Sequence, residues 1–271
     1  MAKVLVVTSG KGGVGKTTST AALGAALAQM GEKVVVIDFD VGLRNLDLVM
    51  GAERRVVFDL INVVQGVAKL SQALIRDKRL ENLWLLPASQ TRDKDALTDE
   101  GIGNIIADLR TKFDWILCDS PAGIERGALL AMRYADEAVI VTNPEVSSVR
   151  DSDRIIGLLD SKTVKAERGE RMEKHILIRR YDLARASRGE MLSIDDILEI
   201  LAAPLLGIIP ESQEVLLASN VGSPVTLNNA ASAPARAYTD AVLRLMGKTV
   251  TMTVPVERKG LMNRLFGRRA A

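Results

Sequence analysis

Short, almost continuously apolar runs recur along the chain, and a polar or glycine-rich turn follows each of them. Strands that are covered on both faces of a sheet have this pattern, because neither row of side chains meets water. Seven such runs predict seven strands, at KVLVVT (3–8), KVVVID (33–38), LWLLP (83–87), WILCD (115–119), EAVIVT (137–142), HILIRR (175–180) and LLGIIP (205–210).

Helical patterns lie between these runs. In residues 17–31, Ala and Leu recur at the i, i+3 and i+4 spacing of a helix, and Gly31 supplies a terminating residue. Ser148, followed by Asp151, has the spacing of a capping box and predicts another helix start. Because strands and helices alternate, the sequence predicts an α/β fold with a mostly parallel sheet flanked by helices on both faces.

The chain divides into three parts by pattern. Residues 1–247 carry the strands and helices and form one predicted domain. Residues 248–258 lack core periodicity and are typical of a flexible tether, and residues 259–271 form a separate segment that is both basic and apolar. Inside the domain, the charged stretch 161–174 predicts a solvated helix end and loop.

Composition narrows the setting. Of 271 residues, 47% are hydrophobic but only 3% are aromatic, so the core must consist mainly of Val, Ile, Leu and Ala. A net charge of +2 gives no argument for nucleic-acid binding. The single cysteine, Cys118, excludes an intramolecular disulfide and suits a reducing compartment. With no secretory leader and no run of ~18 apolar residues, we expect a cytoplasmic chain without membrane-spanning helices.

Residues 10–17, GKGGVGKT, match the phosphate-binding pattern G-x-x-x-x-G-K-[ST] directly after the first predicted strand and at the start of a helix. Glycines allow the tight curvature that aims backbone N–H groups at phosphate oxygens, and the helix N-terminus adds partial positive charge. Lys16 is expected to reach the β- and γ-phosphates, and the Thr17 hydroxyl to ligate Mg²⁺. The rest of the predicted phosphate cradle is Gly10, Lys11, Gly12, Gly13, Val14 and Gly15.

Three carboxylates lie at or just after the ends of predicted strands. Asp38 and Asp119 are the last residues of two of them, and Asp40 comes two residues after Asp38. A single acid at such a place is as readily a helix cap or a solvated loop residue. In a chain with a phosphate loop, the three together predict Asp38 and Asp119 at the Mg²⁺ and Asp40 beside the attacking water.

Lys11 is a second lysine inside the loop. Since the loop backbone wraps the phosphates, a side chain at this position projects away from its own pocket. It could simply face solvent, or it could reach a nucleotide bound by a facing copy of the chain and act there as an arginine finger does. The second alternative predicts that hydrolysis depends on a two-fold symmetric dimer.

The loop GKGGVGKTT resembles the deviant Walker A motif of the Mrp/ParA/MinD family of ATPases. Further blocks, spread over nearly the whole chain, are similar to the cell-division site-selection members of that family: VIDFDVGLRNLDLVMG (36–51), ERRVVFDLINVVQG (53–66), LPASQTRDKDALT (86–98), CDSPAGIERGAL (118–129) and TNPEVSSVRDSDRI (142–155). The resemblance implies a P-loop ATPase that uses ATP and Mg²⁺, in which Lys11 acts across a homodimer.

The resemblance also implies individual contacts. Thr18 would touch the α-phosphate, and Asn45 would touch the nucleotide or the facing subunit. Adenine recognition falls at two strand ends in this family, although many relatives carry Asn near position 179. In this chain the implied adenine contacts are Arg179, Arg180, Pro210 and Glu211.

Partners follow from the same resemblance. Arg150, Asp151 and Asp153 point outward from a predicted helix and would form the docking region for a MinC-like division inhibitor and a MinE-like activator. Without the resemblance, this charged face would be a solvated one. The implied cycle is an ATP-bound dimer that binds the inner membrane, recruits the inhibitor and leaves after stimulated hydrolysis, which places the septum at midcell.

The last segment has its own pattern. Leu261, Met262, Leu265 and Phe266 occur at i, i+1, i+4 and i+5 and form one apolar face. Basic residues surround that face, at Lys259, Arg264, Arg268 and Arg269. An amphipathic helix that lies in the interface of an anionic membrane has this pattern. Packing into the core is the alternative, but a basic segment beyond a polar tether fits it poorly.

Other functions share the loop. A ParA-type ATPase that positions DNA or other cargo is the main alternative, and it would bind DNA with a steep salt dependence. A nitrogenase-type iron protein needs cluster-ligating cysteines, which a single Cys118 does not supply. A membrane scaffold without hydrolysis is disfavoured by the catalytic carboxylates.

Overall fold

Strands make up one sheet in the computed structural model, which describes residues 2–90 and 96–253. Within these residues the sheet has eight strands in the order β3-β4-β2-β5-β1-β6-β7-β8. They are β1 (Lys3–Thr8), β2 (Val34–Asp38), β3 (Ile75–Arg76), β4 (Leu83–Leu86), β5 (Trp115–Asp119), β6 (Glu137–Thr142), β7 (Glu173–Tyr181) and β8 (Leu205–Pro210). All seven predicted strands are confirmed and run parallel. The sequence missed β3, which is two residues long and pairs antiparallel with β4.

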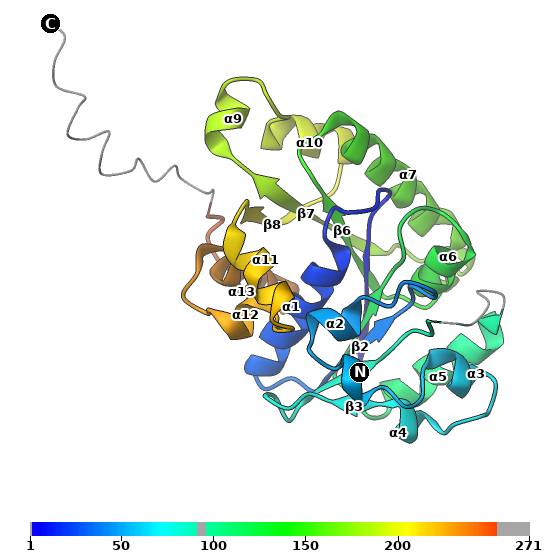
Figure 1. Ribbon diagram of the computed structural model, residues 1–271. Helices are drawn as coiled ribbons and strands as arrows, with labels where there is room; N and C mark the ends of the chain where they lie inside the picture. The colour runs from blue at the N-terminus through cyan, green and yellow to red at the C-terminus, as the bar shows by residue number, and fades with distance from the viewer. Residues whose placement is uncertain (1, 91–95, 254–271) are drawn as a thin grey trace, which may run out of the picture.

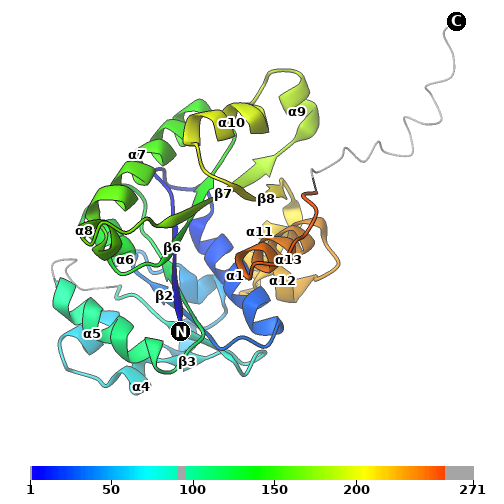
Figure 2. The ribbon, with the colours of Figure 1, turned by 180° about the vertical axis from the view of Figure 1, so that it is seen from behind.

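Helices cover both faces of the sheet, as the alternation predicted. They are α1 (Lys16–Gln29), α2 (Leu46–Val49), α3 (Leu60–Val64), α4 (Leu70–Ala73), α5 (Asp99–Arg110), α6 (Arg126–Arg133), α7 (Val146–Lys162), α8 (Val164–Glu167), α9 (Leu183–Ser187), α10 (Ile194–Leu201), α11 (Gln213–Asn220), α12 (Val225–Asn228) and α13 (Ala233–Leu245), with a 3₁₀ turn η1 (Glu53–Arg55). Figures 1 and 2 show α1, α11, α12 and α13 on one side of the sheet and α5, α6 and α7 on the other.

Two apolar cores lie between the sheet and these helix layers. Side chains alternate across a strand, so Val4 and Val6 of β1 enter one core while Leu5 and Val7 enter the other. Because every central strand is covered twice, its residues are apolar without interruption, and this is the pattern visible in the sequence.

Strand order places the functional loops at one edge of the sheet. β1 lies between β5 and β6. The strands from β2 to β5 form the sheet on one side of β1, and after β5 the chain crosses to β6, β7 and β8 on the other side, so the edge of β1 next to β6 is a topological switch point. Ligands of open parallel sheets bind outside the carboxyl ends of the strands at such a point. The loop after β1 is the predicted phosphate cradle, and β5 and β2 end beside it with Asp119 and Asp38.

Helix α1 confirms its prediction closely, whereas the start of α7 does not. Gly31 follows α1 with φ of 94°, the left-handed conformation that a helix-ending glycine adopts. The capping box at Ser148 is wrong, because α7 already begins at Val146 and has no side-chain cap. Ser148 is buried, and its Oγ accepts a hydrogen bond from the Asn143 backbone N–H at 3.1 Å. It ties the end of β6 to the first turn of α7 instead of capping the helix.

The segment after α13 lies against the domain as far as the structure describes it. The Arg244 guanidinium donates hydrogen bonds to the backbone carbonyls of Leu206, Val250 and Thr251, at 2.7, 3.2 and 2.9 Å. The predicted tether 248–258 therefore starts with residues that the domain holds in place. Its remainder and the predicted helix 259–271 lie outside the described residues.

Candidate active site

The loop between β1 and α1 is built for an anion. Gly15 occupies the N-cap position of α1 with φ of 95° and ψ of 35°, a conformation that residues with a Cβ rarely adopt. Among the residues that the structure describes, no side chain caps this helix end, so its first N–H groups remain available to a ligand. A cavity of about 700 Å³ opens beside the loop. A pocket at a helix N-terminus with a glycine loop fits the polyphosphate of a nucleotide.

Most of the predicted residues meet in this cavity. Its walls include Gly12, Gly13, Gly15, Lys16, Thr17, Thr18, Asp40, Asn45, Arg179, Arg180, Pro210 and Glu211. They come from the loops after β1, β2 and β8, from the start of α1 and from the carboxyl ends of β7 and β8, which the strand order brings together. Asp38 and Asp119 lie just below the surface, at 0% and 1% exposure.

Lys16 folds back over its own loop. Its ammonium donates hydrogen bonds to the Ser9 hydroxyl at 3.0 Å and to the Lys11 carbonyl at 3.4 Å. Burial lowers the pKa of Lys16, and the charges of Asp119 and Asp40 partly oppose that shift. A nearly buried ammonium on the wall of this cavity suits a polyanionic ligand.

Asp38 and Asp119 form the acidic floor of the site. They are paired residues on the neighbouring strands β2 and β5. The Asp38 carboxylate accepts hydrogen bonds from the backbone N–H groups of Asp40 at 2.8 Å and Leu46 at 3.1 Å. Burial and the adjacent Asp119 raise the pKa of Asp38 well above its usual range.

Burial raises the pKa of Asp119 to about 7, against hydrogen bonds from the Thr17 and Thr20 hydroxyls. The Thr20 Oγ1–Asp119 Oδ1 distance is 2.9 Å. Two buried carboxylates whose pKa values are raised in the metal-free protein constitute a site short of positive charge, and Mg²⁺ prefers carboxylate and hydroxyl oxygens. The residues present therefore fit Mg²⁺, with Thr17, Asp38 and Asp119 as the groups that would hold it directly or through water. The ion would supply charge neutralisation at the β- and γ-phosphates.

Lys11 points out of its own cavity. Its ammonium lies 3.1 Å from a Glu145 carboxylate oxygen and 3.2 Å from the Ser147 hydroxyl, at the start of α7. The side chain keeps 42% of its surface exposed. Lys11 and Lys16 therefore leave the same loop in different directions, and Lys16 alone serves the enclosed cavity.

Asn45 also lines the nucleotide cavity. It is exposed and precedes the first residue of α2, so its side chain faces both the cavity and solvent. That placement is compatible with both of the predicted contacts, to nucleotide and to a facing subunit.

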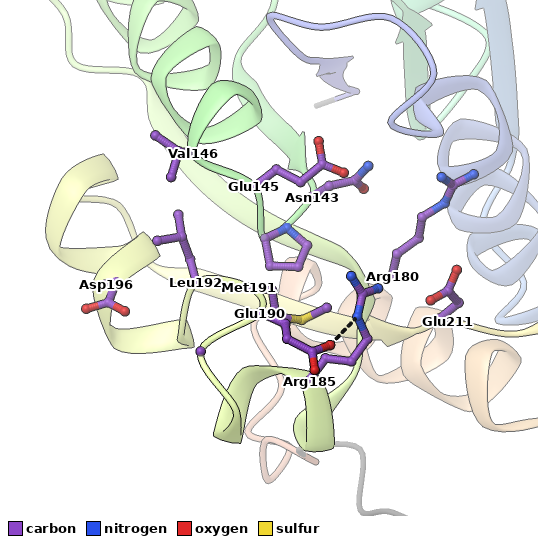
Figure 3. Close-up of a pocket in the computed structure, with 12 residues that line it drawn as sticks. Asn143, Glu145, Val146, Arg180, Arg185, Glu190, Met191, Leu192, Asp196 and Glu211 are labelled. Carbon is purple, nitrogen blue, oxygen red and sulfur yellow. Dashed lines mark ion pairs between the residues drawn. The ribbon is translucent and has the colours of Figure 1, made fainter.

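The predicted adenine contacts lie at the far end of the cavity from the carboxylates. Arg180 has φ of 53°, and the β7–β8 register shifts at this residue before the pairing resumes between Tyr181 and Pro210. Arg180 and Glu211 also line a second cavity of about 580 Å³. Figure 3 shows that cavity bounded by Asn143 and Glu145 on one side and by the Arg185–Glu190 ion pair, 3.4 Å long, on another.

The predicted partner residues lie on α7, close to the phosphate loop. Arg150 and Asp153 are exposed, whereas Asp151 is half-buried. Gly10 packs against the backbone of Asp151 so closely that a Cβ at Gly10 would collide with it. The first turns of α7 therefore pack against the phosphate loop. Of the three predicted partner residues, only Arg150 and Asp153 are exposed to solvent.

Several site residues escaped the sequence analysis. The Ser9 hydroxyl accepts a hydrogen bond from the Lys16 ammonium, and the Thr20 hydroxyl donates one to the Asp119 carboxylate. Thr20 lies one helical turn after Thr17, so its spacing was a usable signal. Residues between Ser212 and Ser219, at the start of and along α11, also line the cavity. No sequence signal marked them, because only the tertiary structure brings α11 next to the phosphate loop.

Two further predictions concern membranes. Leu261, Met262, Leu265 and Phe266 lie outside the described residues. Within the described part of the chain, the structure contains no helix whose length and apolar character would allow it to cross a bilayer.

Known proteins resemble this chain over nearly its full length. The family described as CobQ/CobB/MinD/ParA nucleotide binding domain matches residues 5–225. The septum site-determining protein MinD of Escherichia coli (strain K12) is 61% identical over 270 residues, which span 98% of this chain and 100% of that relative.

Solved structures agree with this similarity. The MinC:MinD cell division protein complex of Aquifex aeolicus matches with 43% identity and a TM-score of 0.84, over 93% of this chain and 99% of that one. The septum site-determining protein MinD complexed with Mg-ADP from Pyrococcus horikoshii OT3 matches with 32% identity and a TM-score of 0.80, over 90% and 96% of the two chains.

Proposed function

This chain belongs to the MinD proteins, the septum site-determining ATPases of the MinD/ParA family, and on that premise we propose a cycle in which ATP controls pairing, membrane binding and partner recruitment. It is an enzyme that hydrolyses ATP with Mg²⁺ and acts in division-site selection. Its sequence is far more similar to septum site-determining proteins, at 61% and 43% identity, than to a ParA family ATPase of the same fold, at 21%, so the DNA-positioning alternative is set aside.

Pairing is the first step of the proposed cycle. The observation that carries it is the direction of Lys11, whose ammonium leaves its own cavity and reaches the Glu145 and Ser147 side chains instead. In the proposed dimer, each Lys11 serves the nucleotide of the facing subunit, where an added cation stabilises the charge that develops on the transferred phosphoryl group. Hydrolysis is then slow in a single subunit.

An apolar rim supports the same proposal. Four large apolar side chains on the loop before α2 and on α11 and its C-terminal end are more than half exposed: Leu43 (68%), Leu216 (62%), Leu217 (59%) and Val221 (68%). Leu43 and Leu216 also line the nucleotide cavity. Exposed apolar side chains gathered beside a ligand site indicate a surface that another protein covers. In the proposed cycle that protein is the second subunit.

Membrane binding follows from pairing. Burying the four apolar residues of the predicted segment 259–271 is worth roughly 6–12 kcal/mol. Its basic residues add about 1 kcal/mol each at an anionic surface. Ordering about ten residues costs on the order of 10–15 kcal/mol, so one segment binds weakly. Two segments on one dimer make the second insertion intramolecular, which strengthens binding by roughly 10²–10⁴-fold. ATP would thereby bring the protein to the cytoplasmic face of the inner membrane.

Partners complete the cycle. The matched Aquifex aeolicus structure is a complex of MinC with MinD, which supports a MinC-like division inhibitor as a partner of this chain. We place its docking region, and that of a MinE-like activator, on α7 around Arg150, Asp151 and Asp153. Activator-stimulated hydrolysis would separate the subunits and release them from the membrane, leaving the inhibitor away from midcell.

Liposome sedimentation tests the cycle. The full chain is mixed with anionic vesicles and Mg²⁺ plus ATP, ADP or no nucleotide, in parallel with a chain that ends at residue 258. We expect ATP-dependent sedimentation of the full chain only. Equal sedimentation of both chains, or sedimentation that ignores the nucleotide, would refute the coupling of nucleotide to membrane binding.

A further inference from the structure

Arg179 is a buried cation on the wall of the nucleotide cavity. It lies near the carboxyl end of β7 and is only 7% exposed. Leu177, two residues earlier on the strand, enters the core on the α1 side of the sheet. Because side chains alternate along a strand, Arg179 projects to that same side, toward the start of α1.

Its guanidinium rests on the phosphate loop. Nη1 donates a hydrogen bond to the Val14 carbonyl oxygen at 3.2 Å. Gly15 packs directly beneath the guanidinium, since a Cβ at Gly15 would overlap Nη1 and approach Cζ. Gly15 is therefore required twice, for its φ of 95° and for the space that Arg179 fills.

The charge of Arg179 has no matching anion among residues 2–90 and 96–253. No carboxylate lies within ion-pair distance of it, and its Nε is buried without a hydrogen-bond partner. A guanidinium carries five N–H donors, and Val14 uses one of them. Leaving a charged group buried and unpaired is costly, so such an arrangement indicates a missing anionic ligand.

The fold indicates which part of a nucleotide that ligand is. β7 lies on the opposite side of β1 from β5 and β2, whose ends carry Asp119 and Asp38. The metal end of the polyphosphate therefore points away from Arg179. Pro210, which ends β8, and Glu211, which follows it, lie one strand further out on the Arg179 side, where the base is expected. Arg179 stands between the metal end and the base end.

We propose that Arg179 is a further binding residue of the nucleotide site and that it contacts the α-phosphate, the phosphate nearest the base. In this role it is a second cation at the loop, supplied from β7, while Lys16 serves the β- and γ-phosphates. Before a nucleotide arrives, the hydrogen bond to Val14 holds the guanidinium ready against Gly15. The proposal deepens the ATPase function and rests on nucleotide binding at this loop.

Calorimetric titration of the full chain with ADP tests the proposal, using Arg179→Met and Arg179→Gln. Arg179→Met keeps the shape of the side chain without its charge, and Arg179→Gln keeps an N–H donor that can serve Val14. We expect both variants to bind ADP at least about tenfold more weakly, as befits the loss of one charge-assisted hydrogen bond. Arg171→Met removes an exposed cation that precedes β7 and is the matched control, expected to bind ADP as the wild type does.

Two further measurements separate a phosphate contact from other roles. Inorganic tripolyphosphate, which has no base, should bind both variants more weakly than the wild type, by the same factor as ADP does. Thermal unfolding without nucleotide should show Arg179→Met at least as stable as the wild type, because an unpaired buried charge has been removed.

Unchanged ADP affinity in either variant would overturn the proposal. Weakened ADP binding with unchanged tripolyphosphate binding would also overturn it, because Arg179 would then contact the base. Weakened binding together with a lower melting temperature would overturn it as well, because Arg179 would then stabilise the loop and not bind the phosphate. If the wild type itself bound no ADP, the nucleotide function would fail, and that result is distinct from all of these.

Discussion

Asp38 and Asp119 stand side by side at the ends of β2 and β5, and both carboxylates are closed off from solvent. Burial raises the pKa of each, and the two negative charges disfavour one another. Without a cation, the folded protein therefore holds at least one of these carboxyls in its protonated form more readily than the unfolded chain does. The metal site weakens the metal-free fold.

Asp119→Asn should make this cost visible as a pH dependence. The pKa of Asp119 is about 7 in the folded protein, against an ordinary value of 3.8 for the unfolded chain. The protonated Asp119 carboxyl therefore contributes its full stability below pH ~4, and this contribution is lost as the pH rises through 7. In EDTA, the wild type should lose on the order of 2–4 kcal/mol relative to Asp119→Asn between pH 4 and 8. Urea unfolding at several pH values measures the difference. Parallel stability curves would contradict the prediction.

Gly15→Ala should damage both the loop and the Arg179 contact. A residue with a Cβ is strained at φ of 95°, at a cost of about 1–3 kcal/mol, and the methyl group would displace the guanidinium. We expect lower stability and lost ADP binding, measured by urea unfolding and calorimetry. Gly157→Ala is the control, because Gly157 is exposed on α7 with open space around it, and Ala there should add about 0.5–1 kcal/mol. A fully stable, ADP-binding Gly15→Ala protein would disprove the strain argument.

Lys16→Ala and Lys11→Ala should separate binding from pairing. Lys16 reaches into the cavity, so its loss should abolish productive ATP binding. Lys11 points outward, so Lys11→Ala should still bind ATP as a monomer but neither dimerise nor turn over. Calorimetry, analytical ultracentrifugation and phosphate release measure the three properties. An ATPase rate of Lys11→Ala equal to that of the wild type would remove the case for a lysine acting across the dimer.

Phe266→Asp should detach the protein from membranes. The substitution puts a charge into the predicted apolar face, so ATP-dependent sedimentation with anionic liposomes should be lost while ATP affinity is unchanged. Ala271→Asp adds the same charge outside that face and should sediment nearly as well as the wild type. Continued sedimentation of Phe266→Asp would show that another part of the chain holds the membrane.

Local sequence signals predicted most of the candidate site. The glycine-lysine spacing of residues 10–17 placed the phosphate loop, because its curvature needs glycine at particular positions. Asp38 and Asp119 were identifiable because each ends an apolar run, and parallel strands end at the same edge. The same reasoning failed at Ser148, whose spacing to Asp151 is that of a capping box but whose hydroxyl hydrogen-bonds the end of β6. A side chain with two possible backbone partners is assigned only when the packing is known.

The sequence by itself predicted seven of the eight described strands, helix α1 and the phosphate loop, and it proposed roles for Lys16, Thr17 and the three carboxylates, because each of these depends on residue type and near-neighbour spacing. Tertiary structure alone decided that Asp38 pairs with Asp119, that Lys11 meets Glu145 outside its own cavity, and that Arg179 covers Gly15. Gly15 and Arg179 are 164 positions apart, and no periodic pattern links them. Such contacts depend on the order of the strands in the sheet and on which of several nearby groups each side chain binds. No local stretch of residues specifies either.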